Sequence, residues 1–233
     1  MDDLKLITFD LDDTLWPCRG VIEKAEAAVY QWLQQNYPAI TDSYDVDAFH
    51  QRRITHYKEN RHLGHDVSAM RKDAFRAVAR EHDYSETLAE DAFGVFMDYR
   101  NRVTPYDDVA TALETLSRHY RLAALTNGNS DPHKIGMGHF FEFCLNAADA
   151  GAMKPHPAIF ELALSKSGVD AEQTLHVGDN PLDDVHGAQQ LGIHTVWVNR
   201  YDKAWPDEVP KARLDVASIQ ALVELLITSA AVE

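Results

Sequence analysis

The chain has 233 residues, of which 37 are acidic and 22 are basic, so its formal net charge is −15. This excess of negative charge argues against nucleic acid or an anionic membrane as the partner, because both are themselves negatively charged. The length allows one large domain or two modest ones with an adequate core. The two cysteines, Cys18 and Cys144, are too few for a disulfide scaffold.

The sequence also bears on where the protein works. No stretch approaches the ~20 consecutive apolar residues of a membrane-spanning helix, and the N-terminus has no charged and then apolar leader. We therefore expect a cytoplasmic protein.

Short apolar runs that stop at polar residues predict buried parallel strands. In chain order they lie at residues 4–11, 121–126, 174–178 and 194–198. Between the first and second of these runs, apolar residues at helical spacing predict helices instead, at 21–35, 46–60, 67–82 and 85–103. Later helices are predicted at 108–119, 158–167, 185–191 and 218–228.

This order of elements predicts an α/β fold. Strands that alternate with helices after Pro105 indicate a doubly wound parallel sheet with helices on both faces and ligands at the carboxyl ends of the strands. We therefore expect a doubly wound core at residues 1–16 and 105–233, interrupted by an all-helical cap at roughly 17–104. Such a cap would close over a ligand and exclude bulk water.

The first predicted strand ends in two carboxylates, Asp10 and Asp12. On an extended chain, residues two apart share a face and stand ~6–7 Å apart, which leaves room for a phosphoryl group between them. Asp10 can attack phosphorus as a nucleophile, and Asp12 can act as the general acid and base. Trp16 follows this loop, where it either stacks on a substrate ring or packs at a domain junction.

Two further stretches supply candidate phosphate ligands. The strand that ends at Thr126 is followed by Asn127 and Gly128, so the Thr126 hydroxyl and the backbone N–H of Asn127 can donate to phosphate oxygens. The Asn-Gly pair also turns the chain. Lys154 lies in a loop at a predicted helix start and adds a compact positive charge suited to phosphoryl oxygens.

A fourth stretch, after the strand at 174–178, supplies Asp179, Asp183 and Asp184. Beside Asp10, one or two of these carboxylates would complete an all-oxygen pocket suited to Mg²⁺. The ion would also offset the repulsion between an anionic nucleophile and an anionic phosphate.

Together the four stretches, 9–15, 125–129, 154–155 and 177–184, resemble the motifs of the haloacid dehalogenase (HAD) superfamily, whose helical insert after the first motif is called a C1 cap. The resemblance implies that Asp10 is the nucleophile and Asp12 the acid and base, with its backbone carbonyl on Mg²⁺. It implies phosphate binding by Thr126 and Lys154 and metal binding by Asp179.

For the final acidic position of the motif, Asp184 matches better than Asp183, because Asp184-Val185-x-Gly187-Ala188 follows the superfamily's usual continuation. Asp183 remains an alternative.

The predicted function is that of a Mg²⁺-dependent phosphomonoester hydrolase of a small phosphorylated metabolite. Around 125–129 and 140–143 the sequence resembles bacterial HAD phosphatases associated with flavin mononucleotide and with the phosphorylated ribityl-aminouracil of riboflavin synthesis. Two alternatives stay open: a 2-haloacid dehalogenase, which needs the nucleophile but no acid, and a catalytically silent HAD-like binding protein. The sequence leaves the oligomeric state open.

Overall fold

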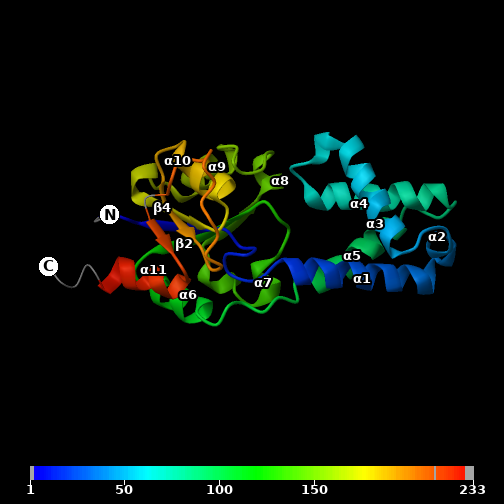
Figure 1. The fold of residues 1–233 in the computed structure, drawn as a ribbon, viewed down its shortest axis with the longest axis horizontal. Helices are drawn as coiled ribbons and strands as arrows, with labels where there is room; N and C mark the ends of the chain where they lie inside the picture. Colours follow the sequence, from blue (N-terminus) through cyan, green and yellow to red (C-terminus); the bar gives the residue numbers. More distant parts are fainter. Residues whose placement is uncertain (1–2, 213, 229–233) are drawn as a thin grey trace. The chain divides into compact units, whose positions relative to one another are not determined.

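The computed structural model describes residues 3–212 and 214–228, and the chain divides into two compact units (Figure 1). One unit, here called the core, comprises the chain up to Pro17 and from Thr104 onwards. The other, the helical unit, is Cys18–Val103. The chain therefore leaves the core after its first strand and returns before its second.

A parallel sheet forms the centre of the core. Among the described residues it has six strands: β1 (Leu6–Phe9), β2 (Arg121–Thr126), β3 (Phe143–Asn146), β4 (Thr174–Gly178), β5 (His194–Val198) and β6 (Leu214–Val216). Their order is β3-β2-β1-β4-β5-β6, and all neighbours are parallel. Because β1 lies between β2 and β4, the loops after these three strands emerge side by side at one edge of the sheet.

Helices cover both faces of the sheet. In Figure 1, α8 (Ala147–Ala150), α9 (Ala158–Ser167) and α10 (Gly187–Gln189) lie on one face, and α6 (Val109–Ser117) and α11 (Ile219–Val223) lie on the other. Apolar side chains of α9, among them Ile159 and Phe160, are fully buried against β1, β2 and β3. The predicted doubly wound α/β fold is therefore confirmed.

Shorter elements complete the core: α7 (Pro132–Ile135), the 3₁₀ turns η2 (Gly138–Phe140) and η3 (Ala171–Gln173), and the π-helical segments η4 (Pro181–His186) and η5 (Glu224–Thr228). The helix predicted at 185–191 begins earlier than expected, because the Asn180 side chain accepts the backbone N–H groups of Leu182 and Asp183 and so caps η4. As a result Asp183 and Asp184 lie in its first turn.

The sequence predicted four of these strands and missed two. Strands β2, β4 and β5 have the predicted bounds, whereas β1 is shorter than the predicted 4–11, so Asp10 lies just beyond it. The missed strands, β3 and β6, form the two edges of the sheet. They are short and only partly buried, so they lack the continuous apolar run that marks a central strand.

The helical unit contains α1 (Arg19–Asn36), α2 (Pro38–Ser43), α3 (Val46–Glu59), η1 (Arg61–Leu63), α4 (Val67–Glu81) and α5 (Leu88–Arg100). Asp45 and Asp66 cap α3 and α4 by accepting backbone N–H groups of the first turn. Helix α1 packs along α5, and the stripe of Val29 and Leu33 is buried in the unit's own hydrophobic core.

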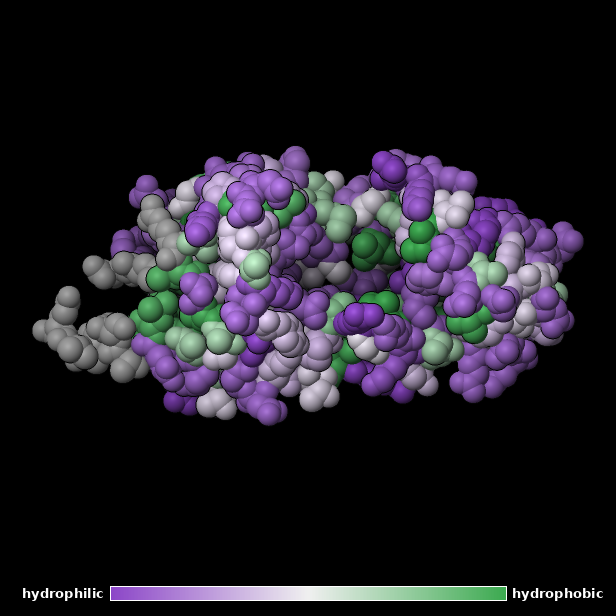
Figure 2. Space-filling model, in the orientation of Figure 1, coloured by the Kyte–Doolittle hydropathy of each residue, from purple (hydrophilic) through white to green (hydrophobic). Residues whose placement is uncertain are grey.

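On the face shown in Figure 2, hydrophilic and intermediate residues cover most of each unit. Among the residues with a described position, the exposed large hydrophobic side chains are Val46, Met153, Leu182 and Tyr201. No helix in the described part of the chain combines the length and the apolar character needed to cross a membrane.

Candidate active site

The loop after β1 carries Asp10 and Asp12 at the carboxyl end of the sheet. The backbone N–H of Asp10 still donates to the carbonyl of Val177 on β4, at 2.9 Å, so the position of Asp10 is fixed by the sheet. Its carboxylate is buried, and Oδ2 accepts the hydroxyl of Thr14 at 3.2 Å. The sheet and Thr14 together hold the candidate nucleophile in one orientation.

The same loop turns back on itself to place Asp12. Asp13 has a left-handed backbone, with a φ of 61°, and its N–H donates to the carbonyl of Trp16 at 2.7 Å. The indole N–H of Trp16 donates to Oδ1 of Asp12 at 3.0 Å. Trp16 is completely buried, which argues against stacking on a substrate ring, one of the two roles considered for it. Its indole N–H orients the candidate acid instead.

Lys154 lies at the centre of the candidate site. Its ammonium group donates to Oδ1 of Asp10 at 2.7 Å, to Oδ1 of Asp184 at 2.6 Å and to the carbonyl of Leu125 at 2.9 Å. Burial would lower the pKa of Lys154, but the two carboxylates outweigh it and raise that pKa above its usual value. Lys154 is therefore a permanently charged, buried cation.

The charge of Lys154 does not balance the charges of the two carboxylates that it contacts, Asp10 and Asp184. Burial would raise the pKa of Asp184, but Lys154 and His176 outweigh it and hold that pKa well below the usual range. Burial raises the pKa of Asp10 well above its usual value, because the attraction of Lys154 does not offset it and Asp184 adds repulsion. One lysine thus serves two carboxylates, so the three groups together carry a net negative charge when both carboxylates are ionised.

Thr126 ends β2 and Asn127 follows it, and both line the same cavity as Asp10. Thr126 is buried, and its hydroxyl oxygen accepts the N–H of Gly128 at 2.9 Å. The Asn127 side chain bonds the backbone of Lys154 in both directions: it donates to the carbonyl at 3.0 Å and accepts the N–H at 2.7 Å. The side chain of Asn127 therefore positions Lys154, and phosphate binding by its backbone N–H stays a prediction.

A buried histidine that the sequence analysis overlooked supports Asp184. His176 on β4 lies 3.3 Å from Oδ1 of Asp184 through Nε2, and its Nδ1 lies 2.8 Å from the hydroxyl of Thr8 on β1. Burial lowers the pKa of His176, so its neutral form can donate to Asp184 and accept from Thr8. Thr8 and His176 lie opposite each other in adjacent buried strands. The sequence feature that could have predicted this contact is a single polar residue in each of two apolar runs.

The carboxylates that follow β4 lie at different depths. Asp184 is buried, and its Oδ2 accepts the N–H of Asn180 at 2.9 Å. It packs so closely on Gly178 that a Cβ at that position would collide with it. Asp183 is half-buried and accepts the side-chain N–H of Asn180 at 3.1 Å. The geometry therefore favours Asp184 over Asp183 as the supporting carboxylate.

Asp179 lies at the mouth of the site. Its backbone carbonyl accepts the indole N–H of Trp197 at 2.8 Å, and its carboxylate lies 3.5 Å from the exposed ammonium group of Lys203. Burial and the nearby charge of Asp184 raise the pKa of Asp179 to about 6. Like Asp10, Asp179 is a carboxyl group whose ionised form is disfavoured by burial and by a neighbouring carboxylate.

A cavity of about 160 Å³ brings the sequence-predicted site residues together. Its walls are Asp10, Asp12, Thr126, Asn127, Gly128, Lys154, Asp179, Asn180, Asp183 and Asp184. These residues come from four segments that are distant in sequence: the loop after β1, the end of β2 with the loop after it, the loop before α9, and the loop after β4 with the first turn of η4. The cavity is small and polar, and its size suits a phosphate group together with a metal ion.

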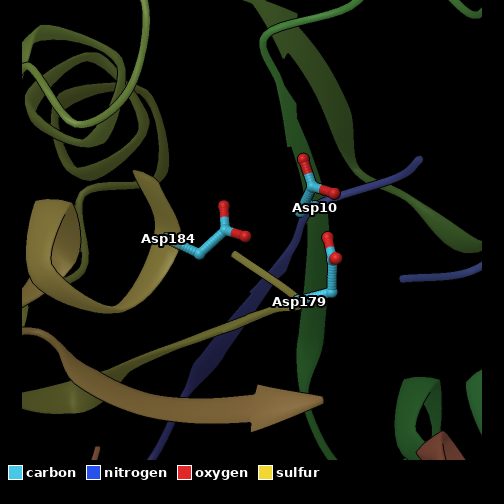
Figure 3. A group of neighbouring side chains, drawn as sticks. All are labelled: Asp10, Asp179 and Asp184. Atoms are coloured by element: carbon cyan, nitrogen blue, oxygen red, sulfur yellow. The ribbon is translucent and has the colours of Figure 1, made fainter. Parts of the chain in front are cut away.

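The donor set fits a hard divalent cation. Carboxylate oxygens of Asp10, Asp179 and Asp184 lie within 4.8 Å of one another, and in Figure 3 the three carboxylates converge on one space. Oxygen ligands of this kind suit Mg²⁺. Burial and neighbouring carboxylates raise the pKa values of Asp10 and Asp179, so a cation bound among the three carboxylates would stabilise their ionised forms.

Comparison with known proteins identifies the family. The family model described as haloacid dehalogenase-like hydrolase matches residues 4–192. The chain belongs to this family of hydrolases. The match confirms the resemblance drawn from the motifs and spans each of the four segments that line the cavity.

Similar HAD proteins carry two kinds of name. The chain is 32% identical to 5-amino-6-(5-phospho-D-ribitylamino)uracil phosphatase YigB of Escherichia coli K12, over 84% of this chain and 83% of that protein. It is 35% identical to a phosphoserine phosphatase of Thermus thermophilus, over 84% of this chain and 89% of that protein. A crystal structure described as a 2-haloacid dehalogenase from Pseudomonas syringae pv. tomato superposes with a TM-score of 0.89 at 36% identity, over 97% of this chain and 99% of that one.

Proposed function

We propose that this HAD hydrolase is a Mg²⁺-dependent phosphomonoesterase that works through an aspartyl-phosphate on Asp10. The observation that carries the proposal is the cavity that holds Asp12 and a cluster of three carboxylates, Asp10, Asp179 and Asp184, with the buried Lys154 as the cation bonded to two of them. Phosphatase relatives support the same reading. A phosphate ester supplies the group that such a cavity suits, and a cation supplies the missing charge.

The proposed reaction has two steps. In the first, an oxygen of Asp10 forms a bond to phosphorus, and the bond from phosphorus to the leaving oxygen breaks as Asp12 gives that oxygen a proton. In the second, Asp12 takes a proton from water, whose oxygen attacks phosphorus and releases inorganic phosphate and the Asp10 carboxylate. The hydrogen bond from Trp16 holds Asp12 in place for both transfers.

In this scheme Lys154 and the proposed Mg²⁺ supply the positive charge that the phosphoryl group needs. Lys154 and the hydroxyl of Thr126 would bind the phosphoryl oxygens together with the backbone N–H of Asn127. We propose that Asp10, Asp179 and the backbone carbonyl of Asp12 hold Mg²⁺, with Asp184 supporting the site through Lys154. The ion, when bound, would neutralise negative charge on the phosphoryl group.

The substrate proposed is a small phosphorylated metabolite. The E. coli relative is named for the ribityl-aminouracil phosphate, and we propose this compound and flavin mononucleotide as the first candidates. The helical unit is proposed to serve as the cap, because the chain enters it directly after the loop of Asp10 and Asp12. Its side chains would then select the leaving group.

A second candidate, dehalogenation of 2-haloacids, is favoured by the similar structure from P. syringae. Displacement of halide from carbon needs a carboxylate nucleophile but no proton donor, because halide leaves as a stable anion. Asp12, held by the indole of Trp16, and Asp179, which completes the acidic cluster, would then have no task. We therefore place phosphate ester hydrolysis first.

One assay separates the candidates. The purified protein is incubated with p-nitrophenyl phosphate, with and without Mg²⁺, and separately with 2-chloropropionate while halide release is followed. We expect Mg²⁺-dependent nitrophenolate release and no halide. Halide release without nitrophenolate would establish the dehalogenase. The absence of both products would favour the catalytically silent binding protein. A panel of flavin mononucleotide, ribityl-aminouracil phosphate, phosphoserine, sugar phosphates and phosphoglycolate then identifies the metabolite.

Replacing Lys154 with Ala is expected to cost ~2–4 kcal/mol of transition-state stabilisation in kcat/KM, the scale of one preorganised electrostatic donor. The change also leaves Asp10 and Asp184 buried without their shared cation, so the free energy of unfolding should fall by ~3–5 kcal/mol. Activity is therefore measured at a temperature where circular dichroism shows the variant folded. An unchanged kcat/KM in folded protein would remove Lys154 from the phosphate site.

A further inference from the structure

Arg200 lies two residues after the end of β5 and outside the cavity walls, and its guanidinium group joins three segments of the core. Nε donates to the backbone carbonyl of Thr14 at 3.2 Å. Nη1 and Nη2 donate to the two carboxylate oxygens of Asp108, at 2.9 and 3.2 Å. The guanidinium carbon also lies 4.0 Å from the centre of the Tyr106 ring. The side chain is about nine-tenths buried, at 10% exposure.

The contact with Thr14 reaches the candidate nucleophile in one further step. The carbonyl of Thr14 accepts from Arg200, and the hydroxyl of the same residue donates to Oδ2 of Asp10. Thr14 is completely buried. A shift of its backbone would therefore move the hydroxyl that orients the carboxylate of Asp10.

The other partners of Arg200 are themselves anchored. Oδ2 of Asp108 accepts the backbone N–H groups of Ile219 and Gln220 at the start of α11, at 2.7 and 3.2 Å. The backbone N–H of Tyr106 donates to the carbonyl of Leu15 at 3.1 Å. The segment by which the chain leaves the core and the segment by which it returns are thus tied together, and the guanidinium group touches both.

The loop needs such an anchor. Between Asp10 and Trp16 the chain reverses through Asp13, whose left-handed backbone is unfavourable for a residue other than glycine. Such a conformation persists only when the surroundings hold it. Arg200 holds the loop at Thr14, the residue that follows Asp13.

We propose that Arg200 is a positioning residue for the loop of residues 11–16, which holds Thr14, and through it Asp10, in the reactive orientation. This inference rests on the phosphatase function proposed above. Arg200 acts through Thr14 and touches neither the cavity nor the reacting atoms, so its loss changes the rate of the chemical steps more than the binding of phosphate by Thr126 and Lys154.

The test is Arg200→Lys, because lysine keeps the charge but loses the planar fork that bonds Asp108 and Thr14 together. We expect kcat for p-nitrophenyl phosphate to fall ~10–100-fold, the scale of a misplaced reacting group, while KM changes little. Hydrogen exchange gives a readout independent of activity. The N–H of Leu15, bonded to the carbonyl of Leu11 at 2.8 Å, is expected to exchange faster in the variant.

Arg121→Lys is the matched control. Arg121 also bonds a carboxylate through two nitrogens, that of Glu142, and a backbone carbonyl, that of Ser167. It is the first residue of β2, so it lies at the amino ends of the strands, whereas the candidate site lies at their carboxyl ends. The control should leave kcat and the exchange of Leu15 as in the wild-type protein.

The outcomes are distinct. A wild-type protein that does not hydrolyse the aryl phosphate defeats the proposed function, whatever the variants do. An active wild type with the same kcat and the same exchange of Leu15 in Arg200→Lys and Arg121→Lys overturns the inference about Arg200. If Arg200→Lys does not fold, Asp108→Asn weakens the same anchor from its other side and is expected to lower kcat and speed that exchange; no change in either overturns the inference.

Discussion

Replacing Asp10 with Asn is expected to lower kcat/KM by ~10⁴-fold or more, the scale seen when a catalytic nucleophile is removed. The amide cannot form the proposed aspartyl-phosphate, so intact-mass measurement after a rapid quench should find no added phosphate. The variant is expected to fold, because Lys154 keeps its bond to Asp184 and the site loses one of its crowded carboxylates.

Asp12→Asn is the matched comparison, since it alters the neighbouring carboxylate of the same loop. It keeps Asp10 and the backbone carbonyl of residue 12, but it cannot transfer a proton. With nitrophenolate as leaving group the first step needs little acid, whereas attack by water still needs a base. Phosphoenzyme should therefore accumulate in this variant.

The two results together test the assignment of roles. Phosphate found on Asp12 in the Asp10→Asn protein would reverse the roles of the two carboxylates. Wild-type turnover in both variants would place the active site elsewhere.

The central part of the fold was predictable because burial leaves a simple pattern. Strands β1, β2, β4 and β5 are nearly continuous apolar runs, since helices cover both of their faces. The edge strands lack this pattern: β6 is Leu214–Val216 with an exposed aspartate in the middle, and β3 alternates buried and half-buried residues. Their pairing depends on the rest of the sheet rather than on their own residues.

The residues that line the candidate site were predictable where they end or directly follow a central strand, because parallel strands deliver their carboxyl ends to one side of the sheet. Asp10, Thr126 and Asp179 meet in the cavity for this reason. The supporting contacts were harder to predict. His176 meets Thr8 across two strands that are far apart in sequence, and Arg200 reaches Thr14 from the loop after β5. Such contacts depend on strand register and side-chain direction, which a single sequence does not show.

The second large effect that we expect is the loss of activity when the divalent cation is removed. Removing Mg²⁺ with a chelator is expected to abolish turnover, and added Mg²⁺ is expected to restore it. The ion supplies several kcal/mol of charge stabilisation, which corresponds to ~100-fold or more in rate. Full activity in excess chelator, with metal removal verified by elemental analysis, would rule out the proposed metal site.

Thermal unfolding gives a readout that does not depend on activity. Mg²⁺ at 100 times its dissociation constant should add ~2.7 kcal/mol to the free energy of unfolding, or about 5 °C or more in Tm for a chain of this size. Asp179→Asn should lose this response. Without metal it should melt no lower than the wild type, because the amide removes a carboxylate whose pKa burial and Asp184 raise to about 6.

Asp183→Asn is the matched control for that measurement. Asp183 lies near Asp179 but is half-buried and bonded to the Asn180 side chain, whereas Asp184 belongs to the acidic cluster. The variant should therefore keep the Mg²⁺ response in Tm. If Asp183→Asn loses the response and Asp179→Asn keeps it, the cation binds at the rim of the cavity, and the cluster of Asp10, Asp179 and Asp184 is not the metal site.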